Sequence, residues 1–219
     1  MNQQILIIGL GQFGMSLAAT LSGKGAEVIA VDIRKNLVEK ASSFVTEALV
    51  LDATDEAELA RLEPGKRDAT VCAIGDDSKE ASIICTALLR QMGSKCVVAR
   101  ANNPMHQRIL QLVGAHQIVN PEQEFGKRFA NRLIYRQLIA DMPLGDGLHL
   151  SEITVTSKMV GKTLIELALP KKYGIMVVAV RRGMPSSVFQ PIPDEPLREN
   201  DNLVLVSKEE AIKKLMESK

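Results

Sequence analysis

Tryptophan is missing from this 219-residue sequence, aromatic residues make up only 3% of it, and it has three cysteines. Cys72, Cys85 and Cys96 lie in apolar segments and lack the C-x-x-C spacing typical of metal and redox sites. We therefore expect buried thiols in a reducing compartment, with no disulfide and no metal bound through sulfur.

Long apolar runs and an excess of one charge are also missing. No segment approaches the roughly 20 apolar residues that a membrane-spanning helix needs. Residues 1–4 run straight into the first predicted strand, so we expect no secretory signal peptide. The formal net charge is +1, with basic and acidic residues interspersed, which argues against nucleic acid as a partner. The expected location is the cytoplasm.

The first 120 residues alternate short β-rich runs with segments that have apolar residues near helical spacing. The predicted strands are 5–8, 27–31, 47–51, 69–73, 95–99 and 117–119. The predicted helices are 14–22, 35–42, 55–61, 79–92 and 104–113. Several strands are apolar without alternation, as in sheets covered on both faces. The pattern predicts the α/β class, with a Rossmann-like, doubly wound parallel sheet.

The segment from Pro121 to Pro143 predicts one long helix, placed at residues 121–142. Its apolar residues form one stripe, which would either cover the sheet or serve as a dimer arm. A proline- and glycine-rich linker, "PLGDGLHL", follows. The predicted domains are therefore residues 1–142, including the long helix, and residues 143–219.

The second domain is expected to be a small α+β unit. Its predicted strands are 150–156, 176–181 and 203–206, and its predicted helices are 163–168 and 209–216. A unit of this size has a marginal core and often gains stability by forming a dimer.

A glycine loop joins the first strand to the first helix in "ILIIGLGQFGMSLAATL". In this G-x-G-x-x-G pattern Gly9 makes the tight turn, Gly11 lets the backbone approach a pyrophosphate, and Gly14 lets the helix lie against the strand. The helix N-terminus then attracts the anion. Asp32 ends the second strand at about the expected distance of roughly 20 residues, where it can accept hydrogen bonds from a ribose and disfavour NADP.

Other candidate residues follow strands at the same edge of the sheet. Asp52 either faces the adenine side of the crevice or caps the helix that begins near Asp55. Arg100 either reaches phosphate or forms a surface salt bridge, and Glu122, just after the sixth strand, is expected on the same edge. We include among the cofactor-binding residues their neighbours and the small residues after the fourth strand: Gln12, Phe13, Ile33, Ala53, Ala73, Ile74 and Gly75.

Catalytic groups are not evident in the sequence. His106, His116 and His149 are scattered without metal-ligand spacing, and no nucleophile–base couple or Y-x-x-x-K pair is present. A dehydrogenase needs an acid or base beside the nicotinamide. We therefore predict no enzyme and no catalytic residue: the nucleotide would be a signal. A small NAD-dependent oxidoreductase remains the alternative.

The sequence as a whole resembles a known family. Its motifs "VVARANNPMHQRILQLVGAHQIVNPEQEFG", "LVLDATDEAEL", "VGKTLIEL" and "LRENDNLVLV", together with the glycine loop, resemble the RCK (TrkA-N/TrkA-C) proteins, which are regulatory subunits of Ktr and Trk potassium uptake systems. With a single pair of N and C domains, the chain looks most like a Ktr-type subunit. The resemblance implies a nucleotide-sensing gating subunit on the inner face of the membrane, bound to a potassium-translocating partner.

The resemblance also implies ligands and assembly. Homodimers would form an octameric ring, with ATP or ADP, or alternatively NAD(H), at the glycine loop. It implies a divalent cation, Mg²⁺ or Ca²⁺, at Glu122, and cyclic di-AMP in the C domain, where Arg181 and Arg182 are the candidate contacts. An NAD-responsive regulator of another cation transporter is a further alternative.

Gln12 departs from the pattern of many Ktr-type subunits, which have arginine at this position. Glutamine can donate a hydrogen bond but carries no charge, and charge-assisted phosphate contacts are about twice as strong as neutral ones. We therefore expect weaker discrimination of ATP from ADP.

Overall fold

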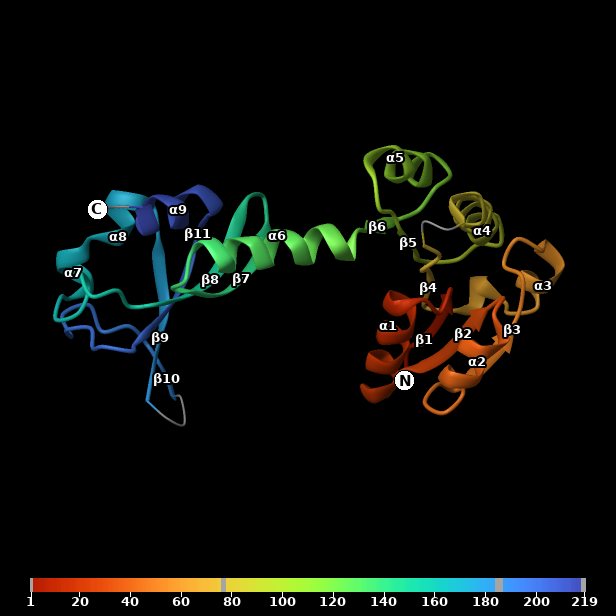
Figure 1. Ribbon diagram of the computed structural model, residues 1–219, viewed down its shortest axis with the longest axis horizontal. Helices are drawn as coiled ribbons and strands as arrows, with labels where there is room; N and C mark the ends of the chain where they lie inside the picture. Colours follow the sequence, from red (N-terminus) through yellow and green to blue (C-terminus); the bar gives the residue numbers. More distant parts are fainter. Residues whose placement is uncertain (1, 76–77, 184–186, 218–219) are drawn as a thin grey trace. The chain divides into compact units, whose positions relative to one another are not determined.

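The computed structural model describes residues 2–75, 78–183 and 187–217. The chain forms two compact units, Met1–Glu124 and Phe125–Lys219. Helix α6 (Pro121–Ile134) crosses the boundary between them (Figure 1). No helix in the described ranges is long and apolar enough to span a membrane.

The first unit is built on a parallel sheet with strand order β3-β2-β1-β4-β5-β6. The strands are β1 (Gln4–Ile8), β2 (Glu27–Asp32), β3 (Glu47–Val50), β4 (Ala69–Cys72), β5 (Val97–Arg100) and β6 (Gln117–Val119). The helices are α1 (Gln12–Gly23), α2 (Lys35–Ala41), α3 (Glu56–Ala60), α4 (Lys79–Gln91) and α5 (Pro104–Leu112), and a 3₁₀ turn, η1, covers Pro64–Lys66. The order confirms the predicted doubly wound fold.

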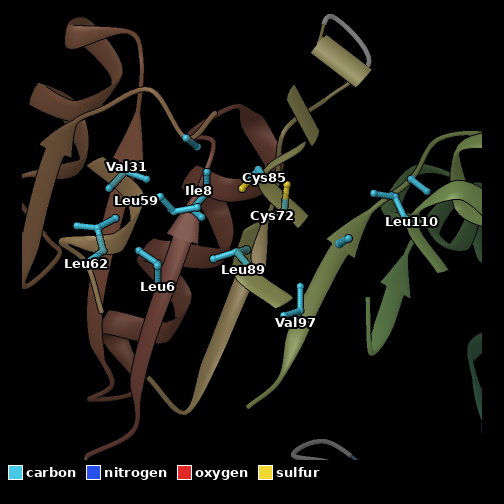
Figure 2. Close-up of a cluster of buried hydrophobic side chains, with 13 residues drawn as sticks. Leu6, Ile8, Val31, Leu59, Leu62, Cys72, Cys85, Leu89, Val97 and Leu110 are labelled. Carbon is cyan, nitrogen blue, oxygen red and sulfur yellow. The ribbon is translucent and has the colours of Figure 1, made fainter. Parts of the chain in front are cut away.

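Both faces of this sheet are covered, as the apolar strands predict. Ile5 and Ile7 of β1 pack with α1 and α2 residues, whereas Leu6 and Ile8 point into a second cluster. Figure 2 shows this second cluster, in which Leu89 of α4 joins residues of α3 and α5. Two of the cysteines, Cys72 and Cys85, are buried in it as free thiols, and Cys96 is half-buried.

The second unit is an antiparallel sheet with strand order β10-β9-β11-β8-β7 and a core of its own. The strands are β7 (Leu138–Gly145), β8 (Leu148–Thr154), β9 (Met176–Arg182), β10 (Ser187–Phe189) and β11 (Asn202–Lys208). Helices α7 (Leu164–Leu167), α8 (Leu169–Tyr173) and α9 (Glu209–Glu217) complete it. This arrangement confirms the small α+β class; β7, β10 and α8 had not been predicted.

The helix predicted for residues 121–142 is wrong beyond Ile134. Residues from Leu138 onward pair with β8 instead, because strand pairing outweighs their local helical pattern. Pro143 is tolerated because β7 is an edge strand, which leaves one side without a ladder partner.

The predicted linker is also wrong, since its residues form a β-hairpin. Gly145, Asp146 and Gly147 all have positive φ angles, of 98°, 51° and 74°. Glycine and aspartate adopt such angles more easily than other residues, so the same residue types that indicated a linker make the hairpin turn.

Candidate functional site

The glycine loop is held tightly between β1 and α1. Gly9 has a φ of +96°, and its amide donates to the Val31 carbonyl at 2.8 Å. A Cβ on Gly14 would lie 1.9 Å from the Gly9 carbonyl oxygen, so only glycine fits there. A Cβ on Gly11, by contrast, would have no atom within 4 Å. The loop therefore has no room for a side chain at Gly14, whereas the space beside Gly11 is open.

Helix α1 starts at this opening. Gly11 is its N-cap residue, and Gln12 is its first residue and is exposed. The first turn has no acidic side chain, and the cap makes no side-chain hydrogen bond. The amide groups at a helix N-terminus have no partner inside the helix, and the helix dipole adds partial positive charge, so this end favours an anion.

A cleft of about 740 Å³ opens at the carboxyl ends of the strands. The strand order reverses between β1 and β4, the point at which doubly wound sheets bind ligands. Of the predicted site residues, the cleft is lined by Gly11, Gln12, Asp32, Ile33, Asp52, Ala53, Ala73, Ile74, Gly75, Arg100 and Glu122. The other predicted residues, Gly9, Phe13 and Gly14, are not among the residues that line it.

Seven residues that line the cleft were not predicted from the sequence. The further lining residues are Ile8, Arg34, Leu51, Thr54, Ser78, Ala81 and Asn102. Most of them are next in sequence to a predicted site residue. Their position near the end of a strand was therefore the signal that could have identified them. Arg34 is the one whose charge matters most, because its side chain reaches back to Asp32.

Asp32 is buried, with 6% of its surface exposed, and its carboxylate is fully hydrogen-bonded. Oδ2 accepts from the Leu10 amide at 2.6 Å, and Oδ1 accepts from the Arg34 amide at 2.9 Å. The Arg34 guanidinium adds Nε to Oδ1 at 3.0 Å and Nη2 to Oδ2 at 3.3 Å. Burial alone would raise the pKa of Asp32, but these hydrogen bonds outweigh it and lower that pKa below 3.8.

Asp52 lines the cleft and does not cap α3. Its Oδ1 accepts from the Thr54 amide at 2.9 Å and the Thr54 hydroxyl at 2.7 Å, which lowers the pKa of Asp52. The N-cap residue of α3 is Asp55, which accepts from the amides of Ala57 and Glu58. The capping alternative for Asp52 is therefore wrong.

Arg100 forms an ion pair with Glu122, and both residues line the cleft. Its side chain is only 14% exposed, and its guanidinium lies 5.9 Å from the centre of the Phe13 ring. An Nη1 atom of Arg100 would lie 3.3 Å from a Cβ on Gly75. A salt bridge, one of the two alternatives expected for Arg100, is therefore present, and both of its residues line the cleft.

Glu122 is the residue predicted to hold a metal. No group of three or more histidine, cysteine, aspartate or glutamate side chains suited to a metal ion occurs in the described part of the chain. A cation at Glu122 would therefore need other ligands, such as phosphate oxygens and water.

The two arginines predicted as C-domain contacts already have carboxylate partners. Arg181 pairs with Glu152 at 3.1 Å. Arg182 is held by Asp201 through two contacts of 2.7 Å and by Glu195 at 2.6 Å. An anion at either guanidinium would have to compete with these carboxylates.

Family models match both parts of the chain: the TrkA-N domain over residues 5–121 and the TrkA-C domain over residues 148–219. The Ktr system potassium uptake protein A of Vibrio alginolyticus is 35% identical over 99% of this chain and 98% of its own length. The Ktr system potassium uptake protein C of Bacillus subtilis is 33% identical over 94% of this chain and 92% of its own.

A solved structure, the GsuK channel bound to NAD, shares the fold, with a TM-score of 0.67 at 20% identity. The likeness covers 100% of this chain and 40% of that longer chain. The GsuK RCK domain has a TM-score of 0.54 at 25% identity over 97% of this chain and 45% of that one. The two domain matches and the full-length relatives together assign the chain to the TrkA-N/TrkA-C family that includes the Ktr system potassium uptake proteins.

Proposed function

We propose that this protein is the cytosolic, nucleotide-sensing regulatory subunit of a Ktr-type potassium uptake system. The observation that carries the proposal is the cleft at the switch point, which brings an open glycine, a buried carboxylate and an arginine together in a chain that matches Ktr proteins over nearly its full length. The membrane-embedded, potassium-translocating subunit would be a separate partner, and this chain would lie at the inner face of the membrane.

The ligand proposed for the cleft is ATP or ADP, with NAD(H) as the alternative. The features of the cleft suit an adenosine phosphate. Gly11 leaves open space at the N-terminus of α1, where a pyrophosphate would lie. Asp32 is a charged acceptor for ribose hydroxyls. Arg100 would contact a further phosphate, and Mg²⁺ or Ca²⁺ bound by that phosphate would use Glu122.

Assembly is proposed to begin with a dimer formed through α6. None of its residues is buried, and Phe125, Phe129, Leu133 and Ile134 are 61%, 46%, 67% and 68% exposed. An apolar stripe of this kind on a soluble protein favours contact with a partner. The dimers would assemble into an octameric ring, which would carry the signal to the membrane subunit.

Regulation would follow from differential binding. A nucleotide changes the equilibrium between two forms of the ring only if it binds one form more tightly than the other. Arg100 and Glu122 give the cleft a charge pair that a third phosphate would rearrange, because phosphate competes with the carboxylate for the guanidinium.

Cyclic di-AMP is proposed as a second ligand, in the C-terminal unit. Arg181 and Arg182 are held by carboxylates, so the contacts would have to come from backbone groups and apolar side chains, or the ion pairs would have to open.

The experiment that tests the proposal is calorimetric titration of the purified protein with ATP, ADP, NAD⁺ and NADH, with and without Mg²⁺. Asp32→Asn should weaken binding about tenfold, because a charge-assisted hydrogen bond becomes a neutral one. Asp146→Asn, the same change in the exposed hairpin turn, is the matched control. Potassium uptake by cells that carry a Ktr-type membrane subunit should then depend on this chain and on Asp32.

Other outcomes would favour the alternatives. Binding of NAD(H) without adenine nucleotides would favour an NAD-responsive regulator. Hydride transfer to a carbonyl or imine substrate would favour an oxidoreductase. Absence of binding by all four nucleotides would overturn the sensing function.

A further inference from the structure

Asp32 has no acceptor position left for a ribose. An ionised carboxylate offers about four lone-pair sites, and each of its oxygens accepts two hydrogen bonds here. Two of the four donors are backbone amides, those of Leu10 and Arg34, which are fixed by the turn after β1 and the turn after β2. The remaining two are nitrogens of the Arg34 guanidinium.

The Arg34 side chain is the part of this arrangement that can move. It is 57% exposed, whereas the side chain of Asp32 is 4% exposed. Arg34 and Asp32 both line the cleft, and the guanidinium lies against the carboxylate that a ribose would have to reach. A ribose hydroxyl can therefore reach Asp32 only where the guanidinium has moved away, because the amides and the carboxylate are held by the backbone and by burial.

We infer that Arg34 is an internal competitor of the nucleotide ribose: it masks Asp32 in the empty cleft and must be displaced when an adenosine nucleotide binds. This inference rests on the proposed nucleotide-sensing function and names the residue that sets the affinity of that site. A site that is masked for part of the time binds with an apparent dissociation constant raised by the inverse of its open fraction.

Competition of this kind predicts an effect that depends on the sugar. ADP carries the 2′ and 3′ hydroxyls that would take the place of the guanidinium on Asp32. In 2′,3′-dideoxy-ADP both hydroxyls are missing, so this ligand gains nothing from displacing Arg34. The phosphates and the base are the same in both ligands, and any general charge effect of Arg34 acts on both.

The test is calorimetric titration of the wild-type protein and the Arg34→Ala variant with both ligands. Arg34→Ala should tighten ADP binding about threefold to tenfold, the range expected when a partly exposed ion pair no longer has to open. Binding of 2′,3′-dideoxy-ADP should change less than about twofold. Arg34→Lys, which keeps the charge but lacks the two-nitrogen fork, should fall between the wild type and Arg34→Ala for ADP.

Lys35→Ala is the matched control, because Lys35 is the adjacent cation, is 80% exposed, and pairs with Glu39 on α2. It should leave both affinities unchanged. Weaker ADP binding by Arg34→Ala, or an equal change for both ligands, would overturn the inference and leave nucleotide sensing intact. Failure of the wild type and the variant to bind either ligand would overturn both.

Discussion

Arg182 and Asp201 face each other as a two-point ion pair, with Nε–Oδ1 and Nη2–Oδ2 distances of 2.7 Å. Asp201 is fully buried, and its other contacts tie two turns together. Its carboxylate accepts from the Arg198 amide at 2.8 Å, and its carbonyl accepts from the Val155 amide at 2.8 Å. The pair therefore joins the end of β9 to the start of β11 in the C-terminal unit.

Removing one partner of this pair should destabilise the C-terminal unit. Arg182→Ala leaves the fully buried Asp201 carboxylate without its cation, and we expect the free energy of unfolding to fall by about 3 kcal/mol. Arg198→Ala is the control, because its side chain is 66% exposed and pairs with Glu195 at 3.2 Å; it should cost less than about 1 kcal/mol. Calorimetric melting measures both, and equal losses would contradict the buried-pair interpretation.

Low pH should destabilise the protein by protonating buried carboxylates such as Asp201 and Asp32. Burial alone raises the pKa of Asp201, but hydrogen bonds from Arg182 and the Arg198 amide outweigh it, so the pKa lies below its ordinary value of 3.8. The pKa of Asp32 is lowered in the same way. A carboxylate with a lowered pKa in the folded state contributes stability above its unfolded pKa, and that stability disappears as the pH falls through the folded pKa.

These two carboxylates should therefore have little effect on the melting temperature between about pH 5 and 8. At pH values below about 4 their protonation should lower the melting temperature. In Asp201→Asn the melting temperature of the C-terminal unit should fall less steeply at low pH, because the carboxylate that would be protonated is missing. A fall at low pH identical to that of the wild type would show that Asp201 does not contribute to it.

The sequence predicted the fold where local pattern and tertiary structure agree. Strand–helix alternation correctly indicated β1 to β6, and several of these strands are apolar without alternation because a strand covered on both faces has no polar side. β7 was missed because its helical apolar spacing continues from α6, and only pairing with β8 makes it a strand. No local signal distinguishes the two, since the partner strand supplies the energy.

The candidate site was predictable only in part, where the positions of its residues follow from the ends of the strands. The ends of parallel strands meet at one edge, so residues that follow strands, such as Asp52 and Arg100, were expected to lie together. The contact of Arg34 with Asp32 was not predictable, because it depends on the rotamer of a long side chain. Likewise, the sequence shows that Arg182 is charged but does not show that its side chain is already paired with Asp201.

Gly14 and Gly11 should respond differently to alanine. Gly14→Ala places a Cβ 1.9 Å from the Gly9 carbonyl oxygen, so β1 and α1 must separate, and we expect a loss of stability of about 3 kcal/mol or more. Gly11→Ala meets no atom within 4 Å and should cost less than about 1 kcal/mol. Urea unfolding measures both values.

Nucleotide binding then separates the two glycines further. Gly11→Ala should fold normally but bind ADP more weakly, because its methyl group takes the space in which a pyrophosphate would approach the backbone. ADP affinity equal to that of the wild type would indicate that the phosphates lie elsewhere.

Gln12→Arg should restore discrimination between ATP and ADP. Gln12 begins α1 and lines the cleft, so an arginine there adds a charged donor near the phosphates. Replacing a neutral contact by a charge-assisted one adds about 1 kcal/mol, or roughly fivefold in affinity, for ATP in particular. Titrations with ATP and ADP measure the ratio, and Gln3→Arg on the exposed N-terminal segment is the control. An equal gain for both nucleotides would show that residue 12 does not contact the third phosphate.

Replacing the phenylalanines of α6 should weaken the proposed dimer. The rings of Phe125 and Phe129 stack with centroids 5.7 Å apart, and both are exposed, so they contribute little to the core of the isolated chain. Serine at both positions removes the apolar surface proposed to bind a second copy, while the melting temperature of a dilute sample should change little. Leu112→Ser, at a 79% exposed position on α5, removes a comparable apolar group elsewhere.

Sedimentation velocity over a range of protein concentrations measures the effect. We expect the dissociation constant of the proposed dimer to rise at least about tenfold for the double variant, since two large apolar side chains are lost from the proposed interface. The Leu112→Ser control should sediment like the wild type. A wild-type protein that is monomeric at all concentrations, or a double variant that remains fully dimeric, would contradict the role proposed for α6, because in either case the exposed stripe would not hold two chains together.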